Sequence, residues 1–250
     1  MSFRKNNTYK YEAGKTFRLS RSGIDSFIKC QRCFYLNKVG NIKDIGMPAF
    51  SLNSNHDDLM KKELDIYRKK GEAHPYMEGL DRNLIPFQHE NMEDWRNNFK
   101  GITYHHEKTD LIITGSVDDV WIDIDTNELV IVEYKSTSTQ KEIDLNDGTP
   151  WKEQYKRQID IYQWLFKMNG FNVADDSVFL YSNGIKASKK FNDVMKFKTY
   201  VLEYKGSTEW VEDKIFEIKQ VLDQKDIPDG SDGCDTCSYV DSVLWFSANE

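Results

Sequence analysis

The sequence predicts a mixed α/β (α+β) fold in which a central mixed sheet is flanked by helices. Two short apolar segments in the middle of the chain, at 111–122 and 129–136, have the composition of strands. Segments with the apolar spacing of helices precede and follow them. With 39% apolar and 30% charged residues over 250 positions, the composition is that of a soluble globular protein.

The N-terminal half is predicted to be mainly helical. Residues 1–16 are polar and basic, and we expect them to form a flexible segment ahead of a single domain over 17–250. Ser20 or Ser22 can cap a helix that runs to about Asn37. The other predictions for this half are a loop at 40–52, a helix at 53–70 that ends before Gly71, an irregular stretch at 72–91 and a short helix at 90–99.

In the C-terminal half, strands are followed by helices. After a strand at 102–108 and the two central strands comes a polar loop at 137–150, and then the clearest helix, Trp151 to Met168. The remaining predictions are strands at 177–182 and 195–204, a helix at 208–222 and a tight polar turn at 229–233. This order gives α/β or α+β as the class.

Charge and hydropathy limit the possible partners and the cellular location of the protein. The net charge is −7, but residues 1–43 carry ten Lys or Arg against Glu12 and Asp25, so this segment could meet phosphates. No apolar run approaches the roughly 18 residues of a membrane helix. The first seven residues also lack the apolar core of a signal peptide. We therefore expect a cytoplasmic protein with no membrane contact.

Charged side chains end the two central strands. Asp118 ends the first, and Glu133 and Lys135 lie two apart in the second, so they project to the same face. The link at 123–128 is rich in turn formers, which predicts a hairpin that brings Asp118 near Glu133. Two carboxylates and a lysine in such a group can bind a hard divalent cation beside a water or a phosphate.

A solvated sheet face is the alternative interpretation of these charges. The segment Leu129 to Val132 is an unbroken apolar run, which indicates a strand buried on both faces. Charges at the end of a buried strand are costly unless they are paired or bound to metal. This context favours the metal site.

Four cysteines fall into two C-x2-C pairs, Cys30 with Cys33 and Cys234 with Cys237. Two such pairs with no cysteine left over indicate a metal site. Disulfides are not expected in a cytoplasmic protein. Four thiolates suit zinc or an iron–sulfur cluster, and the sequence does not separate the two.

These residues carry a resemblance to a known family. Gly-Ser-Val-Asp118 followed by Val-Glu133-Tyr134-Lys135-Ser-Thr resembles the PD-(D/E)XK nuclease superfamily, in particular its RecB-like branch. Three further segments resemble that branch in the right order. They are the Ser20–Leu36 segment, which is similar to the opening helix of CRISPR-associated exonucleases, His56 in a predicted helix, and Gln158-Ile-Asp-Ile-Tyr162, which is similar to a Q-x-x-x-Y motif.

The resemblance implies a restriction-endonuclease-like core and a DNA nuclease that uses Mg2+ or Mn2+. Its metal ligands would be His56, Asp118, Glu133 and the backbone carbonyl of Tyr134. Lys135 would position the attacking water or stabilise charge on the phosphate, and Gln158 with Tyr162 would orient the site. The family pattern selects Asp118 over Asp119, which alternation places on the other face. His105 and His106 are expected to be structural or on the surface.

The cysteines depart from the pattern of the family. Related exonucleases hold a [4Fe–4S] cluster with one cysteine in the opening helix and three near the C-terminus. Cys30, Cys234 and Cys237 match three of these, but the expected position near Val243 has no cysteine, and Cys33 is extra. Zinc is therefore at least as credible, and either group would clip the C-terminal segment to the opening helix.

The substrate expected from the resemblance is single-stranded or end-containing DNA. The partner proteins would belong to a repair, phage or CRISPR-adaptation complex. Two alternatives remain: a non-catalytic nucleic-acid-binding module with a thiolate zinc or iron–sulfur site, which the acidic net charge favours, and a zinc-stabilised protein-interaction domain. The intact Asp118, Glu133, Lys135 and Gln158 favour the nuclease.

Overall fold

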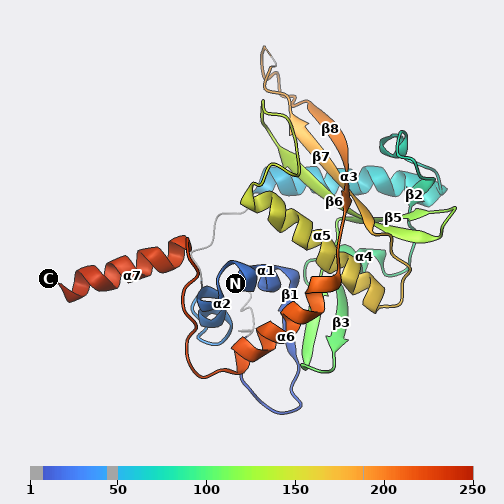
Figure 1. Cartoon of the computed structure of the whole chain (residues 1–250). Helices are drawn as coiled ribbons and strands as arrows, with labels where there is room; N and C mark the ends of the chain where they lie inside the picture. The colour runs from blue at the N-terminus through green and yellow to red at the C-terminus, as the bar shows by residue number, and fades with distance from the viewer. Residues whose placement is uncertain (1–7, 44–49, 188, 250) are drawn as a thin grey trace. The chain divides into compact units, whose positions relative to one another are not determined.

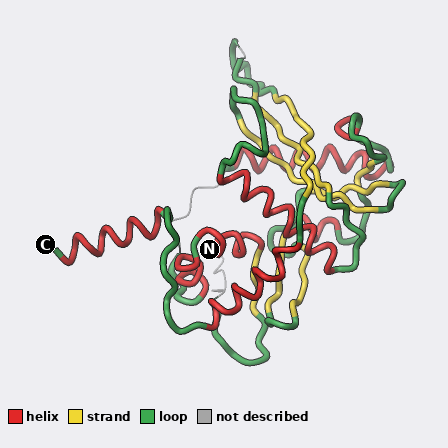
Figure 2. The backbone as a smooth tube through the Cα atoms, in the orientation of Figure 1, coloured by secondary structure: helices red, strands yellow, loops and turns green. Residues whose placement is uncertain are grey.

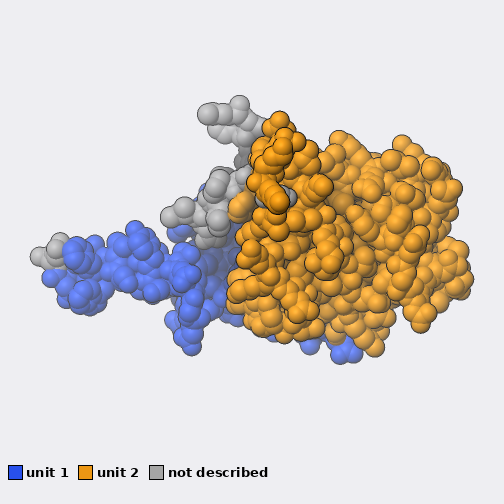
Figure 3. Space-filling model, turned by 90° about the horizontal axis from the view of Figure 1, so that it is seen from above, with its two compact units in different colours: residues 1–48, 105–114, 209–250 blue, residues 49–104, 115–208 orange. Residues whose placement is uncertain are grey.

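The computed structural model describes residues 8–43, 50–187 and 189–249 (Figure 1). Residues 1–7 of the predicted flexible segment and 44–49 of the predicted loop lie outside this range. Contacts between Cα atoms divide the chain into two compact units (Figure 3). Unit 1 comprises Met1–Pro48, His105–Thr114 and Glu209–Glu250, and unit 2 comprises Ala49–Tyr104 and Gly115–Thr208. The single domain over 17–250 stays a prediction.

Unit 1 is mainly helical. It contains strand β1 (Phe17–Ser20) and helices α1 (Arg21–Lys29), α2 (Gln31–Lys38), α6 (Glu209–Asp223) and α7 (Asp235–Ala248). The Ser20 hydroxyl caps α1 by accepting a hydrogen bond from the Gly23 backbone N–H at 3.1 Å, as the sequence predicted. The predicted single helix is interrupted at Cys30, whose extended backbone (φ −161°, ψ 113°) separates α1 from α2.

A three-stranded sheet has the order β1-β4-β3, with β3 at Ile102–His106 and β4 at Leu111–Gly115. Strand β1 pairs in parallel with β4, so that Phe17 faces Leu111. The predicted strand at 111–122 is therefore two strands, because its first part pairs with β1 whereas its second part, β5 (Asp119–Asp123), pairs with β6 (Glu128–Thr137) in another sheet.

Unit 2 is built on a five-stranded mixed sheet with the order β2-β5-β6-β7-β8 (Figure 2). Among the described residues of this sheet, β6 and β7 pair in parallel, and the other neighbouring strands pair antiparallel. The edge strands are β2 (Leu84–Pro86) and β8 (Phe197–Lys205), and β7 (Asp176–Gly184) lies between β6 and β8. The helical elements of this unit are α3 (Ser51–Lys70), the short 3-10 helix η1 (Pro75–Met77), α4 (Met92–Arg96) and α5 (Pro150–Met168).

The two faces of this sheet meet different helices. Met60 and Leu64 of α3 pack in one apolar cluster with side chains of β6 that include Val132 and Tyr134. Because side chains alternate along a strand, Glu133 and Lys135 project to the opposite face, where α5 contacts β6. Complete burial of a side chain such as Leu64 stabilises the fold by about 1.5–3 kcal/mol. Helix α3 therefore holds one side of β6 and leaves the charged side to α5.

Among the described residues, no helix combines the length and the apolar character that crossing a membrane requires.

Candidate active site and cysteine cluster

The hairpin of β5 and β6 brings Asp118 beside Glu133. Asp119 pairs with Val132 in this antiparallel ladder, so Asp118 lies next to the level of Glu133. The Asp118 Oδ2 atom accepts a hydrogen bond from the Tyr134 backbone N–H at 2.9 Å. Asp118 is partly exposed and Glu133 is buried. The predicted hairpin thus places two carboxylates at the end of the strands.

The two carboxylate oxygens of Glu133 have different surroundings. Oε1 accepts hydrogen bonds from Gln158 Nε2 at 2.7 Å and from Lys135 Nζ. Oε2 is buried and has no hydrogen-bond partner among the described residues. A buried carboxylate oxygen without a partner is costly, and a divalent cation with oxygen ligands would remove that cost. The residues present therefore fit a metal ion at this position.

The charges at this site are coupled. Burial, and next the Glu133 carboxylate, raises the pKa of Asp118 to about 7, whereas Lys135 and Lys61 work in the other direction. Burial works against the charged form of Lys135, but Glu133 and Asp118 outweigh it and raise the pKa of this ammonium. A cation between the two carboxylates would favour the ionised form of both.

Tyrosines and a glycine support Lys135 and Gln158. The Lys135 Nζ atom lies 4.4 Å from the centre of the Tyr155 ring. The Tyr162 hydroxyl accepts a hydrogen bond from Gln158 Nε2 at 3.0 Å. A Cβ atom added to Gly115 would lie only 2.5 Å from Tyr162 Cε1, so this glycine allows the ring to approach the strand.

His56 does not join this group. Its Nδ1 atom lies 3.3 Å from Asp57 Oδ1, and its ring packs at 5.4 Å from the ring of Phe197. The physical reason is that α3 covers the sheet face opposite to Glu133. From α3 it is Lys61 that reaches the site, with Nζ at 3.7 Å from Asp118 Oδ1. No local sequence pattern indicates this contact, because it depends on how α3 packs on the sheet.

Asp119 lies on the other face, as alternation predicted. It is fully buried and accepts hydrogen bonds from Arg68, from Arg96 NH2 at 2.9 Å and from the Tyr134 hydroxyl at 2.8 Å. Burial, together with Asp119, raises the pKa of Tyr134 far above its usual value. Sequence reasoning missed both arginines, because nothing local to positions 68 or 96 indicates a buried partner.

The two adjacent histidines, and two residues of the segment Ser20–Leu36, have contacts of a structural kind. His106 is buried, with Nδ1 at 2.8 Å from Thr109 Oγ1, and His105 is exposed. Arg32 donates to Asp241 at 3.0 Å, and the Tyr35 hydroxyl donates to the Gln224 carbonyl at 3.1 Å.

The four cysteines of unit 1 form one cluster. Among the residues that the structure describes, they are the single group of three or more His, Cys, Asp or Glu ligand atoms that all lie within 4.8 Å of one another. Three Sγ pairs are 3.6 Å apart: Cys30 with Cys237, and Cys33 with both Cys234 and Cys237. All four thiols are free. The predicted clip between the opening helices and the C-terminal segment is thus present as a set of ligands.

The environment of the cluster lowers the pKa of one thiol, Cys30, whereas burial raises the pKa of Cys33 and of Cys237. Burial raises the pKa of the Cys30 thiol, but hydrogen bonds from the backbone of Ser231 and Cys33 outweigh it and lower this pKa to about 6. The Ser231 N–H lies 3.5 Å from Cys30 Sγ. Gly230 comes close enough that an added Cβ would lie 3.0 Å from Cys237 Sγ. A compact set of four thiols with one already acidic fits a thiophilic metal ion.

The comparison with protein families agrees with the resemblance. A family profile described as the PD-(D/E)XK nuclease superfamily matches residues 51–242. No curated protein matches significantly. Among solved structures, SSO0001 is 13% identical, with 87% of this chain and 80% of that chain covered and a TM-score of 0.38. A structure from Eubacterium rectale described as a "Putative exonuclease" is 15% identical, with 96% and 93% covered and a TM-score of 0.44.

Proposed function

Because this chain belongs to the PD-(D/E)XK nuclease superfamily, we propose that it is a metal-dependent deoxyribonuclease acting on single strands or DNA ends. The observation that carries the proposal is the buried, unpartnered Oε2 atom of Glu133 beside Asp118. The other oxygen of Glu133 is held by Lys135 and Gln158, so the free one has a fixed direction.

Each residue of the site has a distinct role in this proposal. Asp118, Glu133 and the carbonyl of Tyr134 would hold Mg2+ or Mn2+, and the chemistry supplied by that ion is activation of a water and polarisation of the scissile phosphate. Lys135 stabilises the charge that develops on the phosphoryl oxygens. Gln158 fixes the orientation of Glu133. In the reaction, the water oxygen bonds to phosphorus, the P–O bond to the leaving sugar breaks, and the leaving oxygen takes up a proton.

The predicted ligand role of His56 does not enter the proposal. Its ring would have to leave Phe197 and cross from the α3 side of the sheet. Lys61 takes the position toward Asp118 instead. His56→Ala is therefore expected to change cleavage far less than substitutions at Asp118.

The experiment that tests the nuclease is cleavage of end-labelled single strands in Mn2+. We expect Asp118→Asn and Lys135→Met to lose about a hundredfold or more of the rate, because each removes a group at the reacting phosphate. Asp125→Asn is the matched control, since Asp125 is exposed in the turn of the same hairpin. An Asp118→Asn variant with the wild-type rate would refute the mechanism. Salt-sensitive DNA binding by a wild type that does not cleave would support the non-catalytic binding module instead.

We also propose that the four cysteines hold one tetrahedral Zn2+ ion. Around zinc, with Zn–S bonds of about 2.3 Å, the sulfur atoms lie roughly 3.8 Å apart, and three of the Sγ pairs are at 3.6 Å. A [4Fe–4S] cluster places four irons among the thiolates, which requires wider spacing. A reducing compartment such as the cytoplasm suits four free thiols.

The ultraviolet–visible spectrum of anaerobically purified protein distinguishes the two groups. Zinc leaves the protein colourless, and metal analysis should then give one zinc for each chain. A broad band near about 400 nm would identify an iron–sulfur cluster and refute the zinc assignment.

A further inference from the structure

The segment that joins β7 to β8 is strongly basic. Residues 184–198, called here the basic hairpin, contain five lysines and one acid, Asp193, a net charge of +4 in a chain of net charge −7. All five lysines are exposed. They are Lys186, Lys189, Lys190, Lys196 and Lys198. Ser188 lies outside the described residues. This concentration of positive charge has no role in the site described above.

Backbone hydrogen bonds occur at the base and in the turn of the basic hairpin. The Ile185 N–H donates to the Lys196 carbonyl at 2.8 Å, which continues the antiparallel ladder beyond Gly184. At the tip, the Val194 N–H donates to the Phe191 carbonyl at 3.1 Å, and Asn192 and Asp193 both have positive φ. This is the primed two-residue turn that matches the twist of a hairpin. The segment projects beyond the end of the sheet in unit 2 (Figure 1).

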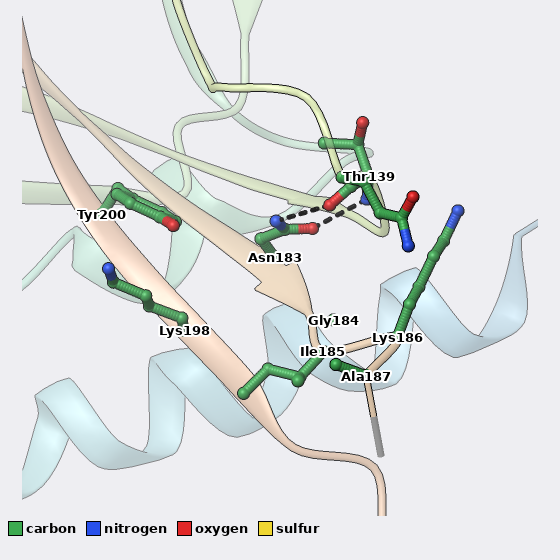
Figure 4. Close-up of a pocket in the computed structure, with 9 residues that line it drawn as sticks. Thr139, Asn183, Gly184, Ile185, Lys186, Ala187, Lys198 and Tyr200 are labelled. Carbon is green, nitrogen blue, oxygen red and sulfur yellow. Dashed lines mark hydrogen bonds between the residues drawn. The ribbon is translucent and has the colours of Figure 1, made fainter. Parts of the chain in front are cut away.

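A cavity of about 300 Å3 lies at the base of the basic hairpin (Figure 4). Its lining includes Lys186, Lys198 and Tyr200, together with Thr139 from the loop after β6. Asn183 ties that loop to β7 by accepting from the Thr139 N–H at 2.9 Å and donating to the Thr139 carbonyl at 3.0 Å. The Lys198 Nζ atom lies 4.8 Å from the centre of the Tyr200 ring.

Strand register places this cavity on the same sheet face as the charged pair of β6. Lys135 is the partner of Tyr181, and Tyr181 is the partner of Tyr200. Asn183 and Lys198 are partners two residues further along, and therefore lie on the same face as Tyr181 and Tyr200. Residues paired across strands project to the same side, and neighbouring strands lie about 4.8 Å apart, so Tyr200 is roughly 10 Å across the sheet from Lys135. Lys135 and the lining residues Lys198 and Tyr200 of the cavity therefore project to the same face of the sheet, with Tyr181 between them.

We propose that the basic hairpin and its cavity bind the sugar–phosphate backbone of single-stranded DNA whose scissile phosphate lies at Asp118 and Glu133. The proposal rests on the nuclease function proposed above. Charge complementarity identifies a polyanion. The hairpin also exposes the aromatic ring of Phe191, which is 67% accessible to solvent. Aromatic side chains stack on bases that a single strand offers and an intact duplex hides, so a single strand is the better match.

The test measures binding separately from cleavage. Fluorescence anisotropy of a labelled oligothymidylate is recorded over a range of salt, with Ca2+ as the divalent ion and a gel to show that the strand is intact. For Lys186→Gln/Lys198→Gln we expect roughly tenfold weaker binding and a salt slope smaller by about 1.4, or about 0.7 for each lost phosphate contact. Unchanged affinity and slope would overturn the proposal.

The control removes the same charge elsewhere in unit 2. Lys69→Gln/Lys205→Gln alters two exposed lysines, at the end of α3 and at the far end of β8. We expect wild-type binding and slope for this variant. An equal loss in the control would show that only net charge matters, and this would also overturn the assignment of the hairpin.

Two further measurements test whether the basic hairpin prefers single-stranded to double-stranded DNA. Phe191→Ala should weaken binding of the oligothymidylate severalfold with an unchanged salt slope, because it removes a stacking surface and no charge. Binding of a blunt duplex should be weaker and insensitive to Phe191→Ala. Equal sensitivity for duplex and single strand would refute the stacking role.

A small substrate separates this proposal from the proposed function. Hydrolysis of a p-nitrophenyl phosphodiester of thymidine, which is too short to reach the basic hairpin, should be the same for wild type and Lys186→Gln/Lys198→Gln. If the wild type hydrolyses neither the end-labelled single strand nor the small phosphodiester in Mn2+, the nuclease proposal fails. The anisotropy measurements still decide whether the hairpin binds DNA.

Discussion

At the scale of single residues, two adjacent aspartates where β5 begins have opposite roles. Asp118 faces Glu133 and Lys61 at the open end of the hairpin, whereas Asp119 is buried between two arginines. Alternation along the strand is sufficient to assign the two aspartates to different faces, and the sequence predicted this correctly. It could not reveal Lys61, Arg68 or Arg96, because these contacts depend on where α3 and α4 pack.

The buried arginines depend on a second carboxylate, that of Asp65. Asp65 Oδ1 accepts from Arg68 Nε at 2.9 Å and from Arg96 NH1 at 2.9 Å. Burial raises the pKa of Asp65, but the hydrogen bond from Arg68 and the charge of Arg96 outweigh it and lower this pKa below 3.8. For a carboxylate with a depressed folded-state pKa, the stabilisation is present above the unfolded value and is lost as the pH falls through the folded value.

We therefore expect Asp65→Asn to lower the free energy of unfolding by about 1–3 kcal/mol at neutral pH. The difference from wild type should shrink as the pH falls below 3.8. Urea unfolding at neutral and acidic pH measures it. Asp94→Asn, which breaks an exposed pair with Lys100, should cost less than about 1 kcal/mol. A difference at Asp65 that did not depend on pH would contradict the ionic role.

At the scale of elements, length and hydropathy predicted the long segments well. The predicted strand at 129–136 corresponds to β6, and the predicted helix from Trp151 corresponds to α5. The wrong predictions are two segments that were expected to be continuous and that the structure divides. Residues 111–122 form two strands because they pair with different sheets, and the opening helix breaks at Cys30. Neither interruption has a local signal, since both are determined by partners distant in sequence.

The packing of α5 on the sheet depends on Gly115. We expect Gly115→Ala to lower the free energy of unfolding by about 1–3 kcal/mol, because its Cβ would meet the Tyr162 ring in a packed core. Gly184→Ala is the control, since its Cβ would find its nearest atom at 3.4 Å. Thermal unfolding of both variants tests the difference.

A second substitution tests whether the Tyr162 ring causes the loss of stability in Gly115→Ala. Tyr162→Leu should restore part of the stability lost in Gly115→Ala, because the two side chains are in contact and their effects should not add. Strict additivity of the two substitutions would show that the ring does not cause the strain.

At the scale of the whole molecule, the two units are interleaved in sequence. Unit 1 is assembled from three separate segments, and unit 2 from two. The two C-x2-C pairs predicted that the four cysteines lie together, but strand β1 and helix α7 were not predicted. Short or late segments of this kind have little local pattern, and their structure depends on unit 1 as a whole.

Loss of two cysteine ligands should affect the two units differently. For Cys234→Ser/Cys237→Ser we expect faster hydrogen exchange in α2 and α7, because the ligands hold these helices together, with little change in β6 and α5 of unit 2. Hydrogen-exchange mass spectrometry of the full chain measures this. Unchanged exchange in α7 would show that the cysteines do not hold the helix.

The wide separation of the two cysteine pairs in the sequence also determines when the cysteine site can be completed during synthesis on the ribosome. Cys33 leaves the peptidyl-transferase centre about two hundred residues before Cys234. At roughly 5–20 residues per second, the first pair waits for about 10–40 s for its partners. During that interval all of unit 2 has been synthesised and can begin to fold. A metal ion that needs all four thiolates, as we propose, could therefore bind only late in the synthesis of this chain, and until then the first pair is open to exchange with disulfides.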